Sequence, residues 1–421
     1  MQIWLGVLVV LVTVYALVKR YETRMVLFAA GIALAIIAGN PMSVFNSFSH
    51  AMKETKLFEN IIAAMGFAMV MKITQCDKHL VAFLGKGAKF AGGLIIPAVV
   101  MLTFFINISV TSAAGCSAAA GAIFIPLLLA SGVKPATAGA AVFAGTIGAM
   151  LNPGHALILV AADVSKATPM EIVANHAVVL VVAGLIGAIS LYFVAKFMKE
   201  DKGHVLAADQ AAAATADFKI NYLWAIVPML PLVILMAGTK VAALKPLSIS
   251  HAMIIGVIVG MIVTRTNPAK VSKEFWHGAG DGFGHVFGII VCAMIFVGGL
   301  NAVGLIKAIT AAMVKNVALA KISSAVGPFL LAALSGSGDA ASVAFNKSVT
   351  INAAQMGLNG MDMASMSVIA ANLGRTMSPA AGACVICAGL AGADPIDLMK
   401  RNAPGMILAL IVSLVMLMYL R

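Results

Sequence analysis

The stretch from residue 371 to residue 390, ANLGRTMSPAAGACVICAGL, places polar groups in an otherwise apolar part of the chain. Asn372, Arg375, Thr376 and Ser378 lie within seven positions, and Pro379 follows them. A guanidinium group binds a carboxylate through two parallel hydrogen bonds, and a proline removes a backbone donor and interrupts a helix. These residue types predict a site for a small anion at a helix break.

Three other stretches combine small and polar residues in a similar way. They are SVTSAAGCSAAAG (109–121), GAMLNPGH (148–155) and SGSGDAASVAFN (335–346). Hydroxyl and amide groups suit small oxyanions, although they also serve in packing between membrane helices. The predicted substrate-binding residues are Ser109, Thr111, Ser112, Asn152, His155, Ser335, Ser337, Asn372, Arg375, Thr376 and Ser378. Asp339 and Asn346 are the candidates for binding a coupling ion, either Na⁺ or a proton.

The composition indicates the class of protein that carries these residues. Of the 421 residues, 62% are hydrophobic and 10% are charged, whereas a soluble domain has about 25% charged residues. The apolar runs are too long for barrel strands and predict an all-α polytopic membrane protein. The net charge of +12 is expected to orient the loops and not to bind nucleic acid. No metal cluster or catalytic triad is recognisable, so we expect neither a cofactor nor enzymatic activity.

Apolar segments form two series on either side of a polar, alanine-rich stretch. They lie at 3–18, 25–39, 59–74, 91–131, 136–164 and 170–197, and then at 221–239, 249–264, 282–300, 322–356, 364–391 and 395–420. Equivalent positions keep an offset of 226 or 227, as in Gly148 with Gly374 and Pro153 with Pro379. This regularity indicates an internal duplication. The predicted parts are a first repeat at 1–198, a cytoplasmic linker at 199–220 and a second repeat at 221–421.

The polar stretches interrupt four of these segments. Segments 91–131 and 322–356 are predicted to be re-entrant helical hairpins, and segments 136–164 and 364–391 are predicted to be broken helices. Each repeat then crosses the membrane five times, and because five is odd the second repeat is inverted. The two hairpin tips should therefore meet near the middle of the bilayer. Polar backbone at such breaks is tolerated only inside protein or beside water, so the four breaks are expected to form one site.

The charged residues at these breaks have several interpretations. Arg375 satisfies the carbonyl groups of the broken helix, pairs with Asp339, or binds a substrate carboxylate. The position equivalent to Arg375 is Ala149, so the duplication itself requires no cation, and the third interpretation is favoured. Asp339 binds Na⁺, carries a proton, or pairs with Arg375. His155 contacts substrate, responds to protons, or is hydrogen-bonded within the fold.

The distribution of positive charge predicts the orientation of the chain. With the N-terminus outside, 16 Lys and Arg residues fall on the cytoplasmic side and 10, Lys347 among them, on the other side. Positive residues favour cytoplasmic loops. We therefore expect both termini in the periplasm.

Three stretches carry a resemblance to a known family. ANLGRTMSPAAG (371–382), SGSGDAA (335–341) and the region from SVTSAAG through IFIPLLLASGVKPATAGAAV (109–142) resemble segments of the DcuC-type anaerobic C4-dicarboxylate transporters. The resemblance implies transport of succinate, fumarate or malate across the bacterial inner membrane, by efflux, uptake or exchange. It also implies a homodimer in the lipid bilayer, in which a transport domain moves against a scaffold domain in an elevator mechanism.

The sequence thus predicts a secondary transporter of C4-dicarboxylates in which Arg375 holds one carboxylate group. Two alternatives remain open. One is a carrier of another organic anion, such as a monocarboxylate or an acidic amino acid. The other is a cation/proton antiporter, in which Asp339 is the working residue and Arg375 is its structural partner.

Overall fold

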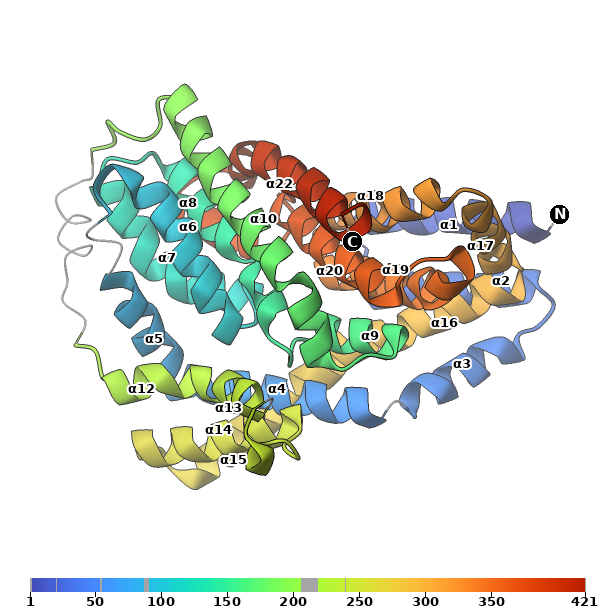
Figure 1. Ribbon diagram of the computed structural model, residues 1–421, viewed down its shortest axis with the longest axis horizontal. Helices are drawn as coiled ribbons and strands as arrows, with labels where there is room; N and C mark the ends of the chain where they lie inside the picture. Colours follow the sequence, from blue (N-terminus) through green and yellow to red (C-terminus); the bar gives the residue numbers. More distant parts are fainter. Residues whose placement is uncertain are drawn as a thin grey trace.

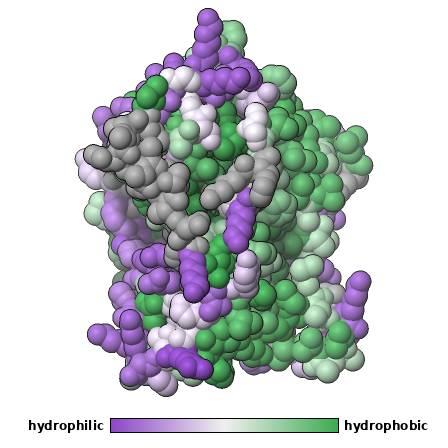
Figure 2. Space-filling view, turned by 90° about the vertical axis from the view of Figure 1, so that its left-hand side faces the viewer, coloured by the Kyte–Doolittle hydropathy of each residue, from purple (hydrophilic) through white to green (hydrophobic). Residues whose placement is uncertain are grey.

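The computed structural model describes residues 2–19, 21–53, 55–86, 91–205, 219–238 and 240–420, and its regular secondary structure within these ranges is helical. Six helices in the described ranges are long and apolar enough to span a bilayer, or up to eight if each of two bent pairs is one span. Large apolar side chains are exposed over the outer surface, and Figure 2 shows broad hydrophobic areas on one face. Such exposure suits contact with lipid. The predicted all-α, multi-pass membrane class is confirmed.

The first half of the chain contains helices of very different lengths (Figure 1). They are α1 (Gln2–Val18), α2 (Thr23–Ile37), α3 (Met42–Met52), α4 (Thr55–Ile73), α5 (Cys76–Gly85), η2 (Gly92–Leu94), α6 (Ile95–Ser109), α7 (Ala113–Ala130), α8 (Pro135–Gly145), η3 (Gly148–Leu151), α9 (Ala156–Ser165) and α10 (Pro169–Phe197). The breaks expected within 91–131 and 136–164 are present, between α6 and α7 and between α8 and α9.

The second half contains the corresponding breaks. Its elements are α12 (Tyr222–Ile226), η4 (Val227–Met229), α13 (Leu230–Gly238), η5 (Ala242–Leu244), α14 (Ile249–Thr264), α15 (Pro268–Asp281), the π-helix η6 (Gly282–Phe287), α16 (Gly288–Ala302), α17 (Leu305–Lys315), α18 (Val317–Ser335), α19 (Gly338–Ser348), η7 (Thr350–Met356), α20 (Gly360–Thr376), α21 (Gly382–Ala391) and α22 (Pro395–Met418). The interruptions lie between α18 and α19 and between α20 and α21. Most of the predicted linker, 206–218, lies outside the described residues.

Two short helices, α5 and α17, were not expected from the apolar pattern. Each follows a corner at which one residue has a positive φ, 60° at Gln75 and 74° at Gly304. At the first corner α4 and α5 meet with a bend of 73°. The same kind of corner therefore occurs at matching places in the two halves.

The helices pack as two groups, which we call the scaffold group (α1–α5 and α12–α17) and the hairpin group (α6–α10 and α18–α22). In the scaffold group, α2 packs on α16, and α4 packs on α14 and α15. In the hairpin group, α18 packs on α20, α10 on α22 and α7 on α21. Contacts between the groups include those of α16 with α19, α5 with α7, α17 with α18 and α4 with α9.

The two hairpins open toward opposite ends of α10, the long helix that crosses Figure 1 diagonally. Its 29 residues make it about 43 Å long. Beyond its C-terminal end, the Glu200 carbonyl accepts a hydrogen bond of 2.9 Å from the backbone N–H of Lys134, which follows the first hairpin. Before its N-terminal end, Asp163 pairs at 2.5 Å with Lys347, near the end of the second hairpin. This arrangement is what inverted repeats require, and their inversion across a membrane remains a prediction.

Equivalent glycines fix each broken helix against the first arm of its hairpin. A Cβ atom on Gly148 would lie 2.0 Å from the carbonyl oxygen of Phe104. A Cβ atom on Gly374 would lie 2.1 Å from the carbonyl oxygen of Phe329. No other residue type permits this approach without a backbone shift. The paired glycines of the sequence thus have a common structural cause.

Candidate functional site

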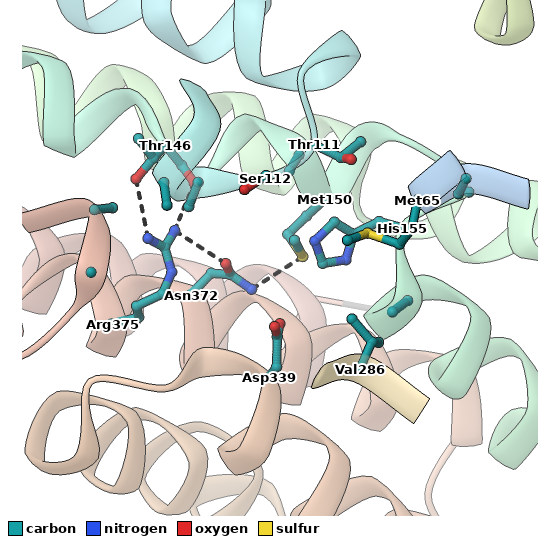
Figure 3. A pocket seen from close by; sticks show the side chains of 18 of the residues that line it. Met65, Thr111, Ser112, Thr146, Met150, His155, Val286, Asp339, Asn372 and Arg375 are labelled. Atoms are coloured by element: carbon teal, nitrogen blue, oxygen red, sulfur yellow. Dashed lines mark hydrogen bonds between the residues drawn. The ribbon is translucent and has the colours of Figure 1, made fainter. Parts of the chain in front are cut away.

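A cavity of about 280 Å³ lies between the scaffold group and the hairpin group. The scaffold group contributes only apolar side chains to it, namely Ile61, Ala64 and Met65 of α4 and Val286 of the π-helix η6. The polar and charged lining residues come from the hairpin group, and Figure 3 shows several of them pointing into the same space. The polar part of the site is therefore carried by one group of helices.

Four helices of the hairpin group begin at this cavity in the described part of the chain. Ala113, Ala156, Asp339 and Gly382, from the first turns of α7, α9, α19 and α21, are all among the lining residues. The first N–H groups of a helix have no partner within the helix, and they give this end a partial positive charge. Anions bind readily at such positions. Four converging helix starts therefore favour a ligand that carries negative charge.

Side chains cap these helix starts to different degrees. Ser112 accepts a hydrogen bond from Gly115 at the start of α7, and Ser337 accepts one from Ala340 at the start of α19, both at 3.2 Å. At α21 the N-cap residue is Ala381, which has no side-chain acceptor. The N–H groups that begin α21 thus remain available to a ligand in the cavity.

Arg375 is 9% exposed and lies at the C-terminal end of α20, a helix that is buried from Met363 to Thr376. Its Nη2 donates to the carbonyl of Thr146 at 2.7 Å, and its Nη1 donates to the Thr146 hydroxyl at 3.3 Å. A longer bond of 3.4 Å reaches Asn372 Oδ1. Arg375 therefore donates to the backbone carbonyl at the end of α8. This agrees with its first interpretation, in which it satisfies the carbonyl groups of a broken helix.

The second interpretation of Arg375, an ion pair with Asp339, is not realised among the described residues. The Asp339 carboxylate lies in the first turn of α19, is exposed, and points into the cavity between Arg375 and His155 (Figure 3). No hydrogen bond to its carboxylate is formed within the described ranges. Arg375 also lines the cavity, so binding of a substrate carboxylate remains a prediction for it.

His155 caps α9 through its ring. Its Nδ1 accepts a hydrogen bond of 3.2 Å from the backbone N–H of Leu157, so this nitrogen carries no proton. In a neutral imidazole the hydrogen then lies on Nε2. Because His155 lines the cavity, it can offer a neutral N–H donor there while it holds the start of α9 in place.

The structure brings six of the residues singled out from the sequence to the cavity: Thr111, Ser112, His155, Asp339, Asn372 and Arg375. Seven others do not line it: Ser109, Asn152, Ser335, Ser337, Asn346, Thr376 and Ser378. Several of these complete the breaks. Asn152, for example, donates to the Ile108 carbonyl and accepts from the Gly154 N–H, both at 2.8 Å.

Sequence reasoning missed several residues that shape the site. Thr146 is the partner of Arg375, and its equivalence to Asn372 at the offset of 226 could have revealed it. Asn107 accepts a hydrogen bond of 2.8 Å from the Ala149 N–H and so ties the first broken helix to its hairpin. His176, which is fully buried, bonds the Met150 carbonyl at 2.9 Å.

Lys347, which was counted among the positive residues that orient the chain, is not a loop residue. It lies in α19, is 6% exposed, and forms the ion pair with Asp163. Asp163 is thereby neutralised by a neighbour and is not a free acid near the breaks. A lysine within a helix of mixed polarity gives no sequence signal that distinguishes a buried cation from a loop residue.

Comparison with known proteins bears on what this cavity serves. The family model described as DcuC, C4-dicarboxylate anaerobic carrier, matches residues 1–421. The chain belongs to the DcuC family. The resemblance to that family, which the sequence analysis based on three stretches, is therefore confirmed, and it extends over the whole chain.

Relatives of this DcuC-family chain agree with the match. A probable anaerobic C4-dicarboxylate transporter DcuC of Vibrio cholerae is 26% identical over 457 residues, covering 99% of this chain and 97% of that protein. The anaerobic C4-dicarboxylate transporter DcuC of Escherichia coli is 24% identical over 452 residues, covering 98% and 95%. A putative uncharacterized transporter of Haemophilus influenzae is 36% identical over 272 residues, covering 62% of this chain and 98% of that protein.

Proposed function

We propose that this DcuC-family chain is a secondary transporter of C4-dicarboxylates such as succinate, fumarate and malate, in the bacterial inner membrane. The observation that carries the proposal is one cavity at which Arg375 and four helix starts meet. A dicarboxylate offers two anionic groups, which such a site can bind at separate places. Transport proceeds by efflux, uptake or exchange, and both termini lie in the periplasm.

The donors around the cavity suggest how a dicarboxylate lies in it. One carboxylate binds Arg375 and the uncapped start of α21 at Gly382. The other binds the Nε2–H of His155 together with the hydroxyl of Thr111. Hydrogen bonds from these groups replace the water that the substrate leaves behind.

Access to the two sides of the membrane alternates by movement of the hairpin group against the scaffold group. The polar contacts of the substrate are all made by the hairpin group, so they can travel with it. The scaffold wall of Ile61, Met65 and Val286 forms no hydrogen bond that would hold the substrate back. The lipid bilayer surrounds the assembly, which we expect to be a homodimer built on the scaffold groups.

A coupling ion, Na⁺ or a proton, accompanies the substrate without any further cofactor. Asp339 is the first candidate because its carboxylate faces the cavity without a hydrogen-bonded partner among the described residues. Asn346 is the second, because its buried Oδ1 accepts no hydrogen bond within the described ranges. Replacing an imposed pH gradient with a Na⁺ gradient in liposomes would show which ion drives uptake.

Exchange of labelled succinate in proteoliposomes tests the transport function. Arg375→Ala should abolish exchange, because it removes the only positive side chain of the described cavity lining. Arg375→Lys keeps the charge and a donor for the Thr146 carbonyl but loses the two-bonded geometry, so exchange should fall and the fold should persist. Wild-type exchange in the alanine variant would contradict the assignment.

The exposed Asp339 also favours a second candidate function, a cation/proton antiporter. In that case Asp339 would exchange a cation for a proton and no organic anion would be needed. Sodium-driven proton flux in liposomes that contain no dicarboxylate would support the antiporter. Its absence, together with succinate exchange, would leave the carrier function.

A further inference from the structure

The cavity holds opposite charges that do not neutralise each other directly. Within the described lining, Arg375 is the cation, Asp339 is the anion, and His155 has the hydrogen-bond pattern of a neutral ring. A plain dicarboxylate brings two further negative charges to this space. Because like charges in a confined site repel, the Asp339 carboxylate works against such a ligand unless a cation accompanies it.

The surroundings of Asp339 suit an organic ammonium group, and with such a ligand the coupling ion of the proposed function falls to Asn346, the second candidate. No group of three or more His, Cys, Asp or Glu side chains in the described residues can hold a metal. The carboxylate is exposed to the cavity and is not enclosed by other oxygen ligands that the structure bonds to it. A primary ammonium group carries three donors and pairs with a single carboxylate without such a cage.

Asp339 and Arg375 are fixed as neighbours by backbone packing. A Cβ atom on Gly338 would lie 3.3 Å from the Ala371 carbonyl and 3.5 Å from the Arg375 side chain. The start of α19 therefore rests on the stem of Arg375, yet Arg375 turns its guanidinium toward Thr146 (Figure 3). A cation and an anion that are adjacent but unpaired match a ligand carbon that bears both a carboxylate and an ammonium group.

We propose that the site is selective for a C4-dicarboxylate with an amino group on carbon 2, and that Asp339 is the residue that determines this selectivity. The carboxylate next to the amino group binds Arg375, the ammonium binds Asp339, and the distal carboxylate binds the Nε2–H of His155. This inference rests on the proposed transport function and names the substrate class within it.

Three compounds that differ only at carbon 2 test the proposal: succinate with hydrogen, malate with a hydroxyl and aspartate with an ammonium group. Each is used to inhibit exchange of labelled succinate in proteoliposomes that contain the full-length protein. Aspartate should inhibit at a concentration roughly tenfold lower than succinate, with malate close to succinate, because a charged hydrogen bond is worth at least about tenfold in affinity.

Two variants assign the effect to Asp339. Asp339→Asn should remove the roughly tenfold advantage of aspartate, so that aspartate and succinate inhibit the remaining exchange at similar concentrations. Asp281→Asn, which removes a carboxylate from the scaffold group away from the cavity lining, should leave the order of the three compounds unchanged.

The possible results separate the two proposals. Equal inhibition by succinate and aspartate in the wild type, or an unchanged ratio in Asp339→Asn, overturns the role of Asp339. If neither the wild type nor any variant exchanges any of the three acids, the proposed transport function is wrong. If the asparagine variant does not assemble in detergent, the wild-type order and the Asp339→Glu variant decide, because the longer carboxylate should alter the aspartate-to-succinate ratio.

Discussion

Arg375 belongs to one half of the chain but is held by the other. Its acceptor, Thr146, occupies the position equivalent to Asn372, so the cation of the second half satisfies the break of the first half. A cation near the C-terminal ends of α8 and α20 also meets the negative ends of two helices. The preference for a purely ligand-binding Arg375 was therefore incomplete, because part of its hydrogen-bonding capacity serves the fold.

The sequence pointed to residues at all four breaks but could not say which of them reach the cavity. Thr111 and Ser112 line it, whereas Ser335 returns its hydroxyl to the Leu331 carbonyl at 2.6 Å. Thr376 likewise donates to the Asn372 carbonyl at 2.8 Å. Which way a hydroxyl turns depends on its place along the helix and on nearby free carbonyls, neither of which follows from residue type.

The paired glycines give a prediction about single residues. Gly374→Ala should destabilise the protein by about 1–3 kcal/mol, because the new methyl group would meet the Phe329 carbonyl. Gly148→Ala should have a similar effect at Phe104. Gly389→Ala is the control, because nothing lies within 4 Å of its added Cβ and its backbone is helical. Thermal unfolding in detergent measures all three, and equal midpoints would contradict the packing argument.

At the scale of elements, the breaks within helices could be predicted from the sequence, whereas the corners before α5 and α17 could not. Pro153 and Pro379 mark the broken helices in the sequence, since proline disrupts the helical hydrogen-bond pattern. The helices α5 and α17 escaped notice because each has about ten residues and begins after a corner that a single residue forms. Gln75 adopts this left-handed conformation although it is not a glycine, so its residue type gives no warning of a corner.

The ion pair between α9 and α19 gives a prediction at this scale. Lys347→Met should destabilise the protein by roughly 2 kcal/mol, because it leaves the Asp163 carboxylate without its partner. The cost stays below that of a fully buried pair, because the Asp163 side chain is 32% exposed. The double variant with Asp163→Leu should recover part of the loss. A double-mutant cycle of unfolding midpoints measures this coupling, and additive effects would exclude it.

At the scale of the whole molecule, the scaffold and hairpin groups follow the order in which the segments occur in each repeat. The first three apolar segments of each half enter the scaffold group, and the hairpin, broken helix and last helix enter the hairpin group. The sequence showed the duplication through its constant offset. It could not show the contacts between groups, such as α16 with α19, because they join surfaces that have no common sequence pattern.

The hydrogen bonds around Glu200 at the start of the linker, which we call the Glu200 clamp, give a prediction about how stability depends on pH. Glu200 binds Arg401 at 2.7 Å and Thr137 at 2.6 Å, and so joins the end of α10 to α22 and α8. Burial raises the pKa of Glu200, but these hydrogen bonds and the positive charge of Arg401 outweigh it, so that the pKa is lowered. The resulting stabilisation is complete above the unfolded value of about 4.3 and is lost as the pH falls through the folded value.

Unfolding midpoints from neutral to acidic pH test this clamp. The wild type should be more stable than Glu200→Gln at neutral pH, and the difference should shrink as the pH falls below about 4.3. Glu171→Gln provides a comparison at the opposite end of α10, where hydrogen bonds to Thr168 in a capping box lower the pKa of the carboxylate without an Arg partner. Parallel curves for the wild type and Glu200→Gln would show that the clamp does not contribute.

The apolar scaffold wall of Ile61, Ala64, Met65 and Val286 has a consequence for the speed of transport. Methyl and thioether groups make only weak, non-directional contacts, and a surface that slides past them exchanges one such contact for another of similar strength. If the hairpin group moves against this wall as proposed, the barrier to that movement depends on the shape of the wall more than on its chemistry. Substitutions among leucine, isoleucine and methionine in this wall should therefore leave the turnover rate nearly unchanged. An aromatic side chain, which protrudes farther from the wall, should lower the turnover rate.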